Sequence, residues 1–376
     1  MHARARRRFP RILVIARGHL GDIVGALPAL RDLRAGYPEA HITVVANEYV
    51  RGALEGCPYV DEIVYGFGYR PRTPWGTALF RARMLARIAL RYDIALVLRS
   101  APRSGPMLGL LSGARQRIGY HQRGFAGRVL TRDLGREPRV QPNRITNLAP
   151  VRALGVDASP VLPRLDWTSS LDRERADDLL ASRGLPAGEP FAVFQIAAHW
   201  GCYEWRSDKW AAVGDHLARA HGLRVVVVGT GEEFEMRKFT EVARLSPGLV
   251  SLQGATTLPE LFHLVSRATL VVSADSALTQ IALAQRVASV VLFGIEPVER
   301  NGPLPDEAVS MMEAVQHWAG PGLAPAPNQH CRFGESHCHT TRCRENSSFE
   351  LISADEVCER IDRVLGRVAS GRAAGV

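Results

Sequence analysis

The feature that most constrains this chain is a regular alternation of short apolar runs with helical segments, which occurs twice. Short runs of branched apolar residues bounded by turns indicate buried strands, and strands that alternate with helices indicate a parallel sheet. A proline-containing stretch at 156–167 separates the two sets. The 376 residues suffice for two domains of about 150 residues each. The sequence therefore predicts an α/β fold with two doubly wound parallel sheets.

Each set has five expected strands with helices between them. In the first half, strands are expected at 12–16, 41–46, 62–65, 94–98 and 115–119, and helices at 23–36, 49–55, 75–91, 105–111 and 142–154. In the second half, strands are expected at 191–196, 223–228, 249–252, 270–273 and 289–293, and helices at 169–183, 207–221, 231–245, 258–265 and 277–285. Residues 120–140 are rich in arginine and lack periodicity, which predicts a basic surface loop. The proline-rich sequence after residue 293 predicts irregular structure, followed by an amphipathic helix at 354–368.

These elements divide the chain into three expected parts. Residues 1–160 form one domain, 161–350 a second, and 351–376 a helix that packs across the domains and ends in a frayed tail. Two α/β domains joined by a linker are expected to leave a cleft between them, which is a preferred place for a ligand.

The composition limits the classes of partner. A formal net charge of +9, carried mainly by arginine, fits nucleic acid, an anionic membrane surface or phosphorylated ligands. No helix-turn-helix, zinc-finger or RNA-binding signature is present, which argues against nucleic acid. No apolar run approaches the roughly 20 residues that span a bilayer, and the basic N-terminus is followed by only a short apolar run. The chain is therefore expected to be cytoplasmic and not exported.

A glycine-bearing turn joins the first strand to the first helix. Gly18 and Gly21 lie in this turn, and Asp22 follows at the expected start of the helix. Two interpretations remain open at this point. Asp22 caps the helix, since Asp is a favoured N-cap, or it carries chemistry at the carboxyl end of a parallel strand, where α/β sheets bind their ligands.

A similar turn occurs in the second half. A strand ends at Ser273, Asp275 and Ser276 form the turn, and a helix follows at once. A helix N-terminus presents unpaired N–H groups and a partial positive charge, which suits an anion. The hydroxyls of Ser276 and Thr279 can add donors for a diphosphate, and the alternative is an ordinary helix cap.

Two further loops of the second half carry candidate ligand contacts. Three tryptophans lie within the eleven residues 200–210, where His199 and Arg206 can face an anion, although the tryptophans fit a core role equally well. After the next strand, Gly229 precedes Glu232 and Glu233, whose carboxylates can accept hydrogen bonds from ribose hydroxyls. The glycine pattern is neither a complete dinucleotide fingerprint nor a P-loop.

The cysteines do not form a disulfide scaffold in a chain of this length. Cys331, Cys338 and Cys343 are interleaved with histidines, so they are candidate metal ligands. Their spacing does not match a Cys-x-x-Cys pair. No metal is therefore predicted.

Four motifs in this order resemble the lipopolysaccharide heptosyltransferases, glycosyltransferase family 9, over nearly the whole chain. They are Leu20-Gly21-Asp22 with Leu27-Pro28-Ala29-Leu30; the pair Trp205 and Trp210; Ser273-Ala274-Asp275-Ser276 followed by an apolar helix and Leu292-Phe293-Gly294; and a cysteine-bearing segment before Ile352-Ser353-Ala354-Asp355-Glu356-Val357.

The resemblance implies the GT-B fold, in which two Rossmann-like domains face a central cleft. It also implies inverting transfer of a sugar from a nucleotide-diphosphate donor, typically ADP-heptose, with no metal or other cofactor required. Asp22 matches the family's catalytic aspartate, whose implied task is that of general base toward the acceptor hydroxyl. The donor is implied to bind the second domain and the acceptor the first.

The expected site residues follow from the motifs and the resemblance together. The donor set is His199, Arg206, Gly229, Glu232, Glu233, Thr256, Asp275, Ser276, Ala277, Leu278 and Thr279. The acceptor set is Arg17, Gly21, Arg99, Arg103, Arg117 and Arg123, with Arg128 nearby, and each arginine has solvated surface charge as its alternative. The expected acceptor is an anionic glycolipid or another glycoconjugate, and the protein is expected to contact the inner face of the cytoplasmic membrane peripherally.

The chain departs from the family pattern in the donor loops. Tyr203 and Glu204 stand where the family places a basic residue before its first tryptophan, and Ala198 and His199 stand where it has hydroxyls. Ala277 replaces a glycine. Arg206 or His199 is the expected substitute for the basic residue. Two alternatives stay open: a tailoring glycosyltransferase of secondary metabolism, and a non-catalytic binding protein on the same fold.

Overall fold

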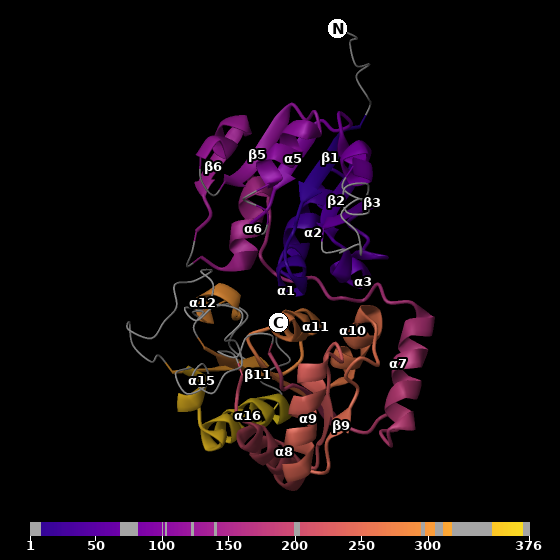
Figure 1. Ribbon diagram of the computed structural model, residues 1–376, viewed down its shortest axis with the longest axis vertical. Helices are drawn as coiled ribbons and strands as arrows, with labels where there is room; N and C mark the ends of the chain where they lie inside the picture. The colour runs from indigo at the N-terminus through magenta and orange to yellow at the C-terminus, as the bar shows by residue number, and fades with distance from the viewer. Residues whose placement is uncertain are drawn as a thin grey trace. The chain divides into compact units, whose positions relative to one another are not determined.

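The structure is a computed structural model that describes residues 9–67, 82–99, 101, 104–121, 124–138, 141–198, 204–294, 298–304, 311–317 and 348–370. The chain divides into two compact units, unit 1 (Met1–Pro163) and unit 2 (Arg164–Val376) (Figure 1). Each unit is described below by itself.

Unit 1 is built on a six-stranded sheet in the order β3-β2-β1-β4-β5-β6, and every pairing is parallel. Its strands are β1 Arg11–Ile15, β2 His41–Asn47, β3 Glu62–Phe67, β4 Ile94–Val97, β5 Gln116–His121 and β6 Arg132–Arg136. Its helices are α1 Leu20–Val24, α2 Leu27–Gly36, η1 Glu48–Val50, α3 Arg51–Leu54, α5 Gly105–Leu111, η2 Gly124–Val129 and α6 Asn143–Arg152, and residues 82–88 are also helical.

Unit 2 has a second six-stranded parallel sheet in the order β12-β11-β10-β7-β8-β9. Its strands are β7 Phe191–Gln195, β8 Arg224–Val227, β9 Val250–Ser251, β10 Leu270–Ala274, β11 Ser289–Phe293 and β12 Met312–Gln316. Its helices are α7 Ser170–Ser182, α8 Ser207–His221, α9 Glu233–Leu245, α10 Leu258–Arg267, α11 Ala277–Gln285, α12 Val298–Asn301, α15 Ser348–Leu351 and α16 Ala354–Ala369.

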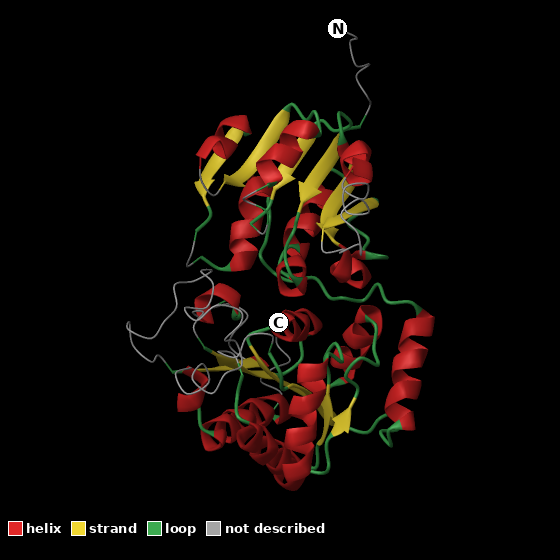
Figure 2. Ribbon diagram, in the orientation of Figure 1, coloured by secondary structure: helices red, strands yellow, loops and turns green. Residues whose placement is uncertain are grey.

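The two sheets have the same strand order when each is numbered from its own first strand. In both, the first and fourth strands lie side by side and the chain winds outward from them in opposite directions. This is the doubly wound order of nucleotide-binding α/β folds, in which ligands bind outside the carboxyl ends of the two central strands. The predicted pair of doubly wound parallel sheets is confirmed, and helices flank the strands of each sheet (Figure 2).

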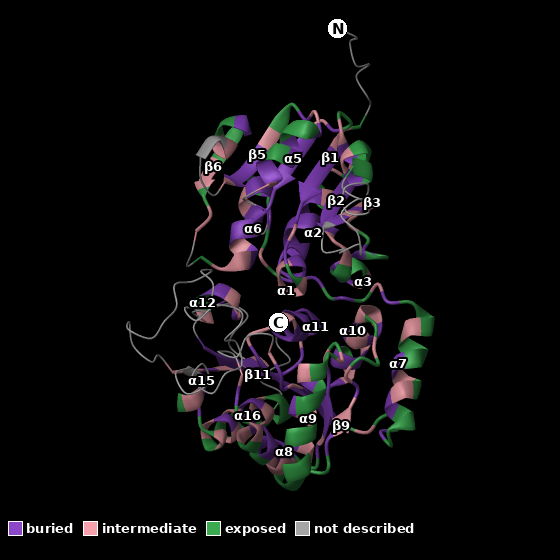
Figure 3. Cartoon of the chain, viewed as in Figure 1, coloured by how far each residue is buried: buried purple, intermediate pink, exposed green. Residues whose placement is uncertain are grey.

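The central strands are buried on both faces, as parallel sheets require. Ile12, Leu13 and Ile15 of β1 are fully buried, as are all the residues of β11 (Figure 3). This burial explains why the sequence carries continuous apolar runs at these places rather than an alternating pattern.

The expected helix at 23–36 is two helices, so that prediction was wrong in detail. Helix α1 ends at Val24 and α2 begins at Leu27. Pro28 lies in the first turn of α2, and proline cannot donate the backbone hydrogen bond that a continuous helix would need there. The break gives Asp22 its own short helix.

The prediction of a basic loop at 120–140 is also wrong, because this segment contains strand β6. The segment after 293, predicted to be irregular, contains strand β12. Both are edge strands. Strand β6 exposes its ends and buries none of its residues completely. An edge strand pairs on one side only, so its sequence lacks the apolar run that marked the central strands.

The C-terminal helix α16 docks within unit 2. It buries Val357, Ile361 and Val364 and packs against α8, β11 and β12. Glu313 on β12 adds a polar attachment, because its carboxylate lies 3.1 Å from Arg360 Nη1 and 2.5 Å from Arg367 Nη1. Desolvation raises the pKa of Glu313, but the hydrogen bonds from Arg367 and Arg360 outweigh it, and the net pKa lies below its usual value.

We expect the attachment of α16 to weaken in acid. A carboxyl whose folded pKa is lowered contributes stability above its unfolded pKa, near 4.5, and loses it as the pH falls through the lower folded value. Hydrogen exchange of the α16 amides should therefore accelerate relative to that of α10 as the pH falls below about 4.5. In Glu313→Gln the difference between the two helices should no longer change over that range. Equal pH profiles for α16 in the parent and the variant would contradict this account.

Candidate functional site

Asp22 lies just beyond the carboxyl end of β1, in the short helix α1, and two groups hold its carboxylate. The backbone N–H of His19 donates to Oδ2 over 2.9 Å; His19 is the N-cap of α1 and Asp22 its third residue, so Asp22 completes a capping box and is not itself the N-cap. Arg99 Nη1 donates to Oδ1 over 2.8 Å. About a fifth of the Asp22 side chain remains exposed (22%), so an approaching group can reach it. The aspartate therefore contributes to the helix cap and also presents an accessible carboxylate.

Arg99 follows β4, the strand beside β1, so the ion pair bridges the two central strands of the sheet. The residue is 9% exposed, and its Nε lies 2.7 Å from a second carboxylate, Glu137 Oε1. Asn147 on α6 accepts from the Arg99 backbone N–H over 3.1 Å and donates to Gly25 O over 3.3 Å. The position of Arg99 is thus fixed from three sides, and Arg99 in turn orients Asp22.

The other side of the Asp22 turn is braced from β2. Asn47 Nδ2 and the Tyr49 hydroxyl donate to Gly18 O over 2.9 and 3.2 Å, and the Tyr49 hydroxyl lies 3.0 Å from His19 Nδ1. Desolvation raises the pKa of Tyr49, and the Asp22 charge adds to the effect. The phenol therefore stays protonated at neutral pH. Half of the Tyr49 side chain is exposed, which makes it a polar contact available beside the candidate base.

Gly18 leaves space for the Asp22 side chain. A Cβ atom at this position would lie 2.2 Å from Asp22 Cβ and 2.6 Å from Asp22 Oδ2, closer than real contacts allow. The requirement for glycine is steric and comes from Asp22 itself.

We expect Gly18→Ala to displace the Asp22 carboxylate and to slow any reaction in which that carboxylate takes part by about 100-fold, since a misplacement of about 1 Å has costs of that order. Gly248→Ala is the matched control, because a Cβ there meets nothing within 4 Å. Steady-state kinetics with circular dichroism of both variants checks the result. Full activity in Gly18→Ala would show that the position of Asp22 is not critical.

In unit 2 the turn after β10 is an ordered helix N-terminus. Ser276 is the N-cap of α11, and its Oγ accepts from Leu278 N over 3.2 Å. The same hydroxyl donates to Gln195 Oε1 over 2.6 Å, and Gln195 ends the neighbouring central strand β7. Asn301 Nδ2 donates to Asp275 Oδ2 over 2.8 Å. This turn therefore lies at the centre of the second sheet, where the strand order favours a ligand. The helix N-terminus suits an anion there.

The residues of the α11 start differ in access. Asp275, Ser276 and Ala277 are partly exposed, whereas Leu278 is buried and Thr279 is fully buried. The Thr279 hydroxyl lies 3.3 Å from Ser273 Oγ, so it faces the sheet. Thr279 thus supports the turn from inside and is not an exposed hydroxyl donor, contrary to the sequence expectation.

The loop after β8 folds around an internal carboxylate. Glu235 Oε2 accepts from Thr230 Oγ1 over 2.9 Å and from Gly231 N over 2.7 Å. A Cβ at Gly229 would lie 2.9 Å from the same oxygen, so a side chain there would have to displace the Glu235 carboxylate. Glu232 and Glu233 are exposed, and Glu233 pairs with Arg237 at 3.3 Å. Thr256, in the loop after β9, is partly exposed.

The tryptophan motif belongs to the core. Trp205 and Trp210 are each 1% exposed and meet edge to face with their ring centroids 5.0 Å apart. Trp205 Nε1 donates to Ile352 O over 3.1 Å, which joins the loop after β7 to the start of the C-terminal region. For these two residues the core interpretation is correct.

The basic residue missing before Trp205 has a counterpart elsewhere in unit 2. Lys238 on α9 lies 3.2 Å from Glu204 Oε1, and the two side chains are only 5% and 9% exposed. The negative charge at position 204 is therefore neutralised inside unit 2. Arg206, the expected substitute, is exposed and paired with Asp208 at 2.8 Å. Glu204 and Lys238 line two cavities, of about 60 and 210 Å³, and both are smaller than the ~300 Å³ of a small-molecule site.

The structure separates the expected acceptor arginines. Arg99 contacts Asp22, and Arg17, in the turn after β1, donates to Ser104 Oγ. Arg117 is the second residue of β5, toward the end of the sheet away from Asp22, and its guanidinium donates to Val129 O and Ala114 O. It is therefore a structural residue, and Arg128 lies exposed in η2.

Some expected residues lie outside the described residues: Arg103, Arg123, His199, Tyr203, Cys331, Cys338 and Cys343. Sequence reasoning missed Asn47, Tyr49, Glu137 and Asn147. Asn47 ends a parallel strand, a signal already used for Asp22, whereas Asn147 is a helical residue without one. In the described part of the chain, no helix is both long and apolar enough to cross a bilayer.

Comparison with known proteins gives a consistent result. The sequence model of glycosyltransferase family 9 (heptosyltransferase) matches residues 81–323, more than half of the chain. The lipooligosaccharide heptosyltransferase 2 of Haemophilus influenzae is 26% identical over 319 residues, which cover 79% of this chain and 87% of that protein. The lipopolysaccharide heptosyltransferase 2 of Salmonella typhimurium is 25% identical over 313 residues, 79% of this chain and 86% of that protein.

Solved structures agree in fold. A family 9 glycosyl transferase from Veillonella parvula superposes with a TM-score of 0.76 at 19% identity and covers 95% of this chain and 97% of its own. The ADP-heptose heptosyltransferase II of E. coli gives a TM-score of 0.69 at 20% identity, over 94% of this chain and 98% of its own. The predicted GT-B class is thereby confirmed. The chain belongs to glycosyltransferase family 9, the heptosyltransferase family, and is a glycosyltransferase.

Proposed function

We propose that this enzyme transfers heptose from ADP-heptose to a hydroxyl group of a lipopolysaccharide-core acceptor, with inversion at the anomeric carbon. The curated relatives are heptosyltransferases that act on lipopolysaccharide or lipooligosaccharide, which favours this acceptor over a secondary metabolite. The observation that carries the proposal is the Asp22 carboxylate, accessible and held by Arg99 and the His19 N–H at the central strands of unit 1.

In this proposal Asp22 is the general base. The acceptor oxygen forms a bond to the anomeric carbon, the bond from that carbon to the diphosphate oxygen breaks, and ADP leaves. The acceptor proton passes to a carboxylate oxygen of Asp22. Arg99 holds one oxygen of the Asp22 carboxylate, and its positive charge is shared between Asp22 and Glu137. Tyr49 and Arg17 are further polar groups for the acceptor.

The donor diphosphate is assigned to the N-terminus of α11. The helix has nine residues, its first turn contains no basic side chain, and the backbone N–H groups of that turn are the source of positive potential. The exposed carboxylates Glu232 and Glu233 are the candidates for the ribose hydroxyls, with Gly229 and Thr256 in the adjoining loops. No metal or other cofactor has a place in this proposal, and the nucleotide sugar is the co-substrate.

The acceptor is proposed to be an anionic glycolipid, met at the inner face of the cytoplasmic membrane. The formal charge of +9 favours attraction to such a surface. Vesicle sedimentation tests this part: the protein should sediment with anionic vesicles at low salt and dissociate as salt is added. Equal binding to neutral vesicles would contradict an electrostatic attachment.

The donor assignment is tested by calorimetry with ADP and ADP-heptose. Ser276→Ala should weaken ADP binding several-fold, about the effect of one lost hydrogen bond at a helix cap. Ser353→Ala is the matched control, because Ser353 caps α16 through Glu356 N in the same way. Unchanged ADP affinity in Ser276→Ala would remove this turn from the donor site. Failure of the parent enzyme to release ADP from ADP-heptose with any core acceptor would contradict the function itself.

A further inference from the structure

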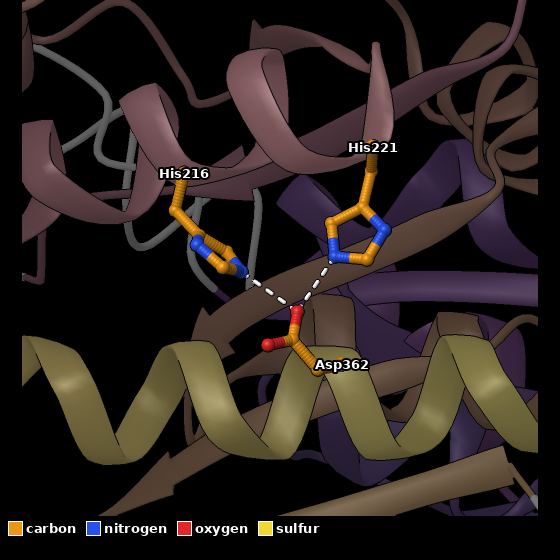
Figure 4. Close-up of side chains that lie close together, drawn as sticks. All are labelled: His216, His221 and Asp362. Carbon is orange, nitrogen blue, oxygen red and sulfur yellow. Dashed lines mark hydrogen bonds and ion pairs between the residues drawn. The ribbon is translucent and has the colours of Figure 1, made fainter.

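Two histidines and an aspartate meet on the surface of unit 2, where α8 and α16 lie against each other. His216 lies in α8, His221 is the last residue of that helix, and Asp362 lies in α16. His216 Nε2 is 2.7 Å and His221 Nε2 is 2.6 Å from the same oxygen, Asp362 Oδ1 (Figure 4). These three ligand atoms lie within 4.8 Å of one another.

We propose that His216, His221 and Asp362 form a binding site for a divalent transition-metal ion, and that zinc suits the site best. Two imidazole nitrogens and one carboxylate oxygen are a ligand set that zinc accepts, with a water molecule in the fourth position. Three side chains that converge on one point from two helices already have most of the required geometry. In the described part of the chain, no other group of three such side chains comes this close together.

The ion would replace the present hydrogen bonds. Zinc bonds of about 2.0–2.2 Å to nitrogen and oxygen hold tetrahedral ligands somewhat more than 3 Å apart, so each Nε2 must move several tenths of an ångström away from Oδ1. The side chains have room for this movement, because His216 and His221 are 25% and 23% exposed and Asp362 is 51% exposed. The same exposure gives an ion a path from solvent.

The charge of the cluster favours a cation. Asp362 contributes the acidic side chain of the three, and one of its oxygens, Oδ1, is the point on which both imidazole nitrogens converge. The nearest cysteine along α16, Cys358, has its pKa raised to about 11 by burial and by the charges of Asp362 and Asp355. Its thiol is protonated at neutral pH and is not part of the proposed ligand set.

The consequence of binding would be structural. His216 and Asp362 are 146 residues apart in sequence, and an ion between them would attach α16 to α8. Helix α16 already buries Val357, Ile361 and Val364 at this interface. The ion would thus stabilise the docked C-terminal helix and take no part in sugar transfer.

Isothermal calorimetry of the chelator-treated full chain with zinc chloride at neutral pH tests the proposal. The parent should show a binding event that weakens about tenfold or more in both His216→Ala and His221→Ala, because one of three ligands is lost. His263→Ala is the matched control, since His263 pairs with Asp177 as a lone histidine and should leave the event unchanged. Zinc should raise the unfolding temperature of the parent and of His263→Ala, but not of the other two.

Two further measurements separate this site from its alternatives. Asp362→His keeps three metal ligands but loses the carboxylate. If the cluster is a metal site, this variant should still bind zinc; if it is only an ion-paired contact, the variant should lose the contact and bind no zinc. Cobalt bound at this site should show no thiolate charge-transfer band. Cobalt bound instead by Cys331, Cys338 and Cys343 would produce one. The proposal is overturned if the parent binds no zinc, or if His216→Ala binds it with the same affinity and stoichiometry as the parent.

Discussion

Asp22→Asn should abolish most of the transferase activity while the protein stays folded. The amide oxygen can still accept from the His19 N–H, and Arg99 keeps its contact with Glu137, so the local structure has reason to persist. The amide cannot take up the acceptor proton, and loss of a positioned general base lowers rates by about 10²–10⁴-fold. The turnover number should fall by that factor with little change in the KM for the donor.

The control is the same substitution at the opposite end of the strands of the same sheet. Asp93 directly precedes β4 and accepts from the Arg11 backbone N–H over 2.9 Å, so it resembles Asp22 in its backbone contact. Asp93→Asn should leave turnover within a factor of about two, since no step of the chemistry is assigned to it. Asp22→Asn with parental turnover would exclude Asp22 as the base. Loss of activity together with loss of folding would be recognised from circular dichroism.

Lys238→Met should be the most destabilising single change considered for unit 2. It removes the ammonium that neutralises Glu204 where both side chains are almost fully buried. Removal of one partner from a buried ion pair costs about 3–5 kcal/mol, because a charge is left in a poorly solvated place. Urea unfolding followed by tryptophan fluorescence should report this loss, since Trp205 and Trp210 lie in the same core.

The neighbouring residue provides the matched control. Arg237 on the same helix pairs with Glu233 across solvent, with side chains 68% and 87% exposed. Arg237→Met should cost no more than about 0.5 kcal/mol, as exposed pairs at this spacing do. The double variant Lys238→Met with Glu204→Leu should recover most of the stability, because apolar side chains can replace a buried ion pair. Equal costs for Lys238→Met and Arg237→Met would contradict the buried-charge account.

The sequence predicted the central strands and most helices because their physical causes are local. Continuous apolar runs mark β1 and β11, and the capping box Thr257–Glu260 marks the start of α10, where Thr257 N donates to Glu260 Oε2 over 2.7 Å. Strand β6 was missed because its residues are polar and pair on one side only. Strand β6 forms because it pairs with β5, and the residues of β6 alone do not show this pairing.

The site was predictable in part for the same reason. Asp22 lies in the first helix after β1 and Ser276 in the turn after β10, so local sequence locates them. The pairing of Asp22 with Arg99 requires β1 and β4 to be neighbours, and strand order does not follow from the strands themselves. The neutralisation of Glu204 by Lys238 and the meeting of His216 with Asp362 join residues far apart in sequence, and tertiary packing alone brings them together.

The two sheets share no strand, and this has a consequence for how such chains diversify. Every described strand pairing lies within unit 1 or within unit 2. The connecting stretch is held at its beginning by Arg31, whose Nη1 donates to Val161 O, and near its end by Gln285, whose Nε2 donates to Leu165 O. Recombination between family members within 162–164 would therefore break no ladder. If the acceptor binds unit 1 and the donor unit 2, as proposed above, acceptor and donor preferences would be inherited as separate modules, and chimeric enzymes with new combinations should be obtainable by exchange of halves.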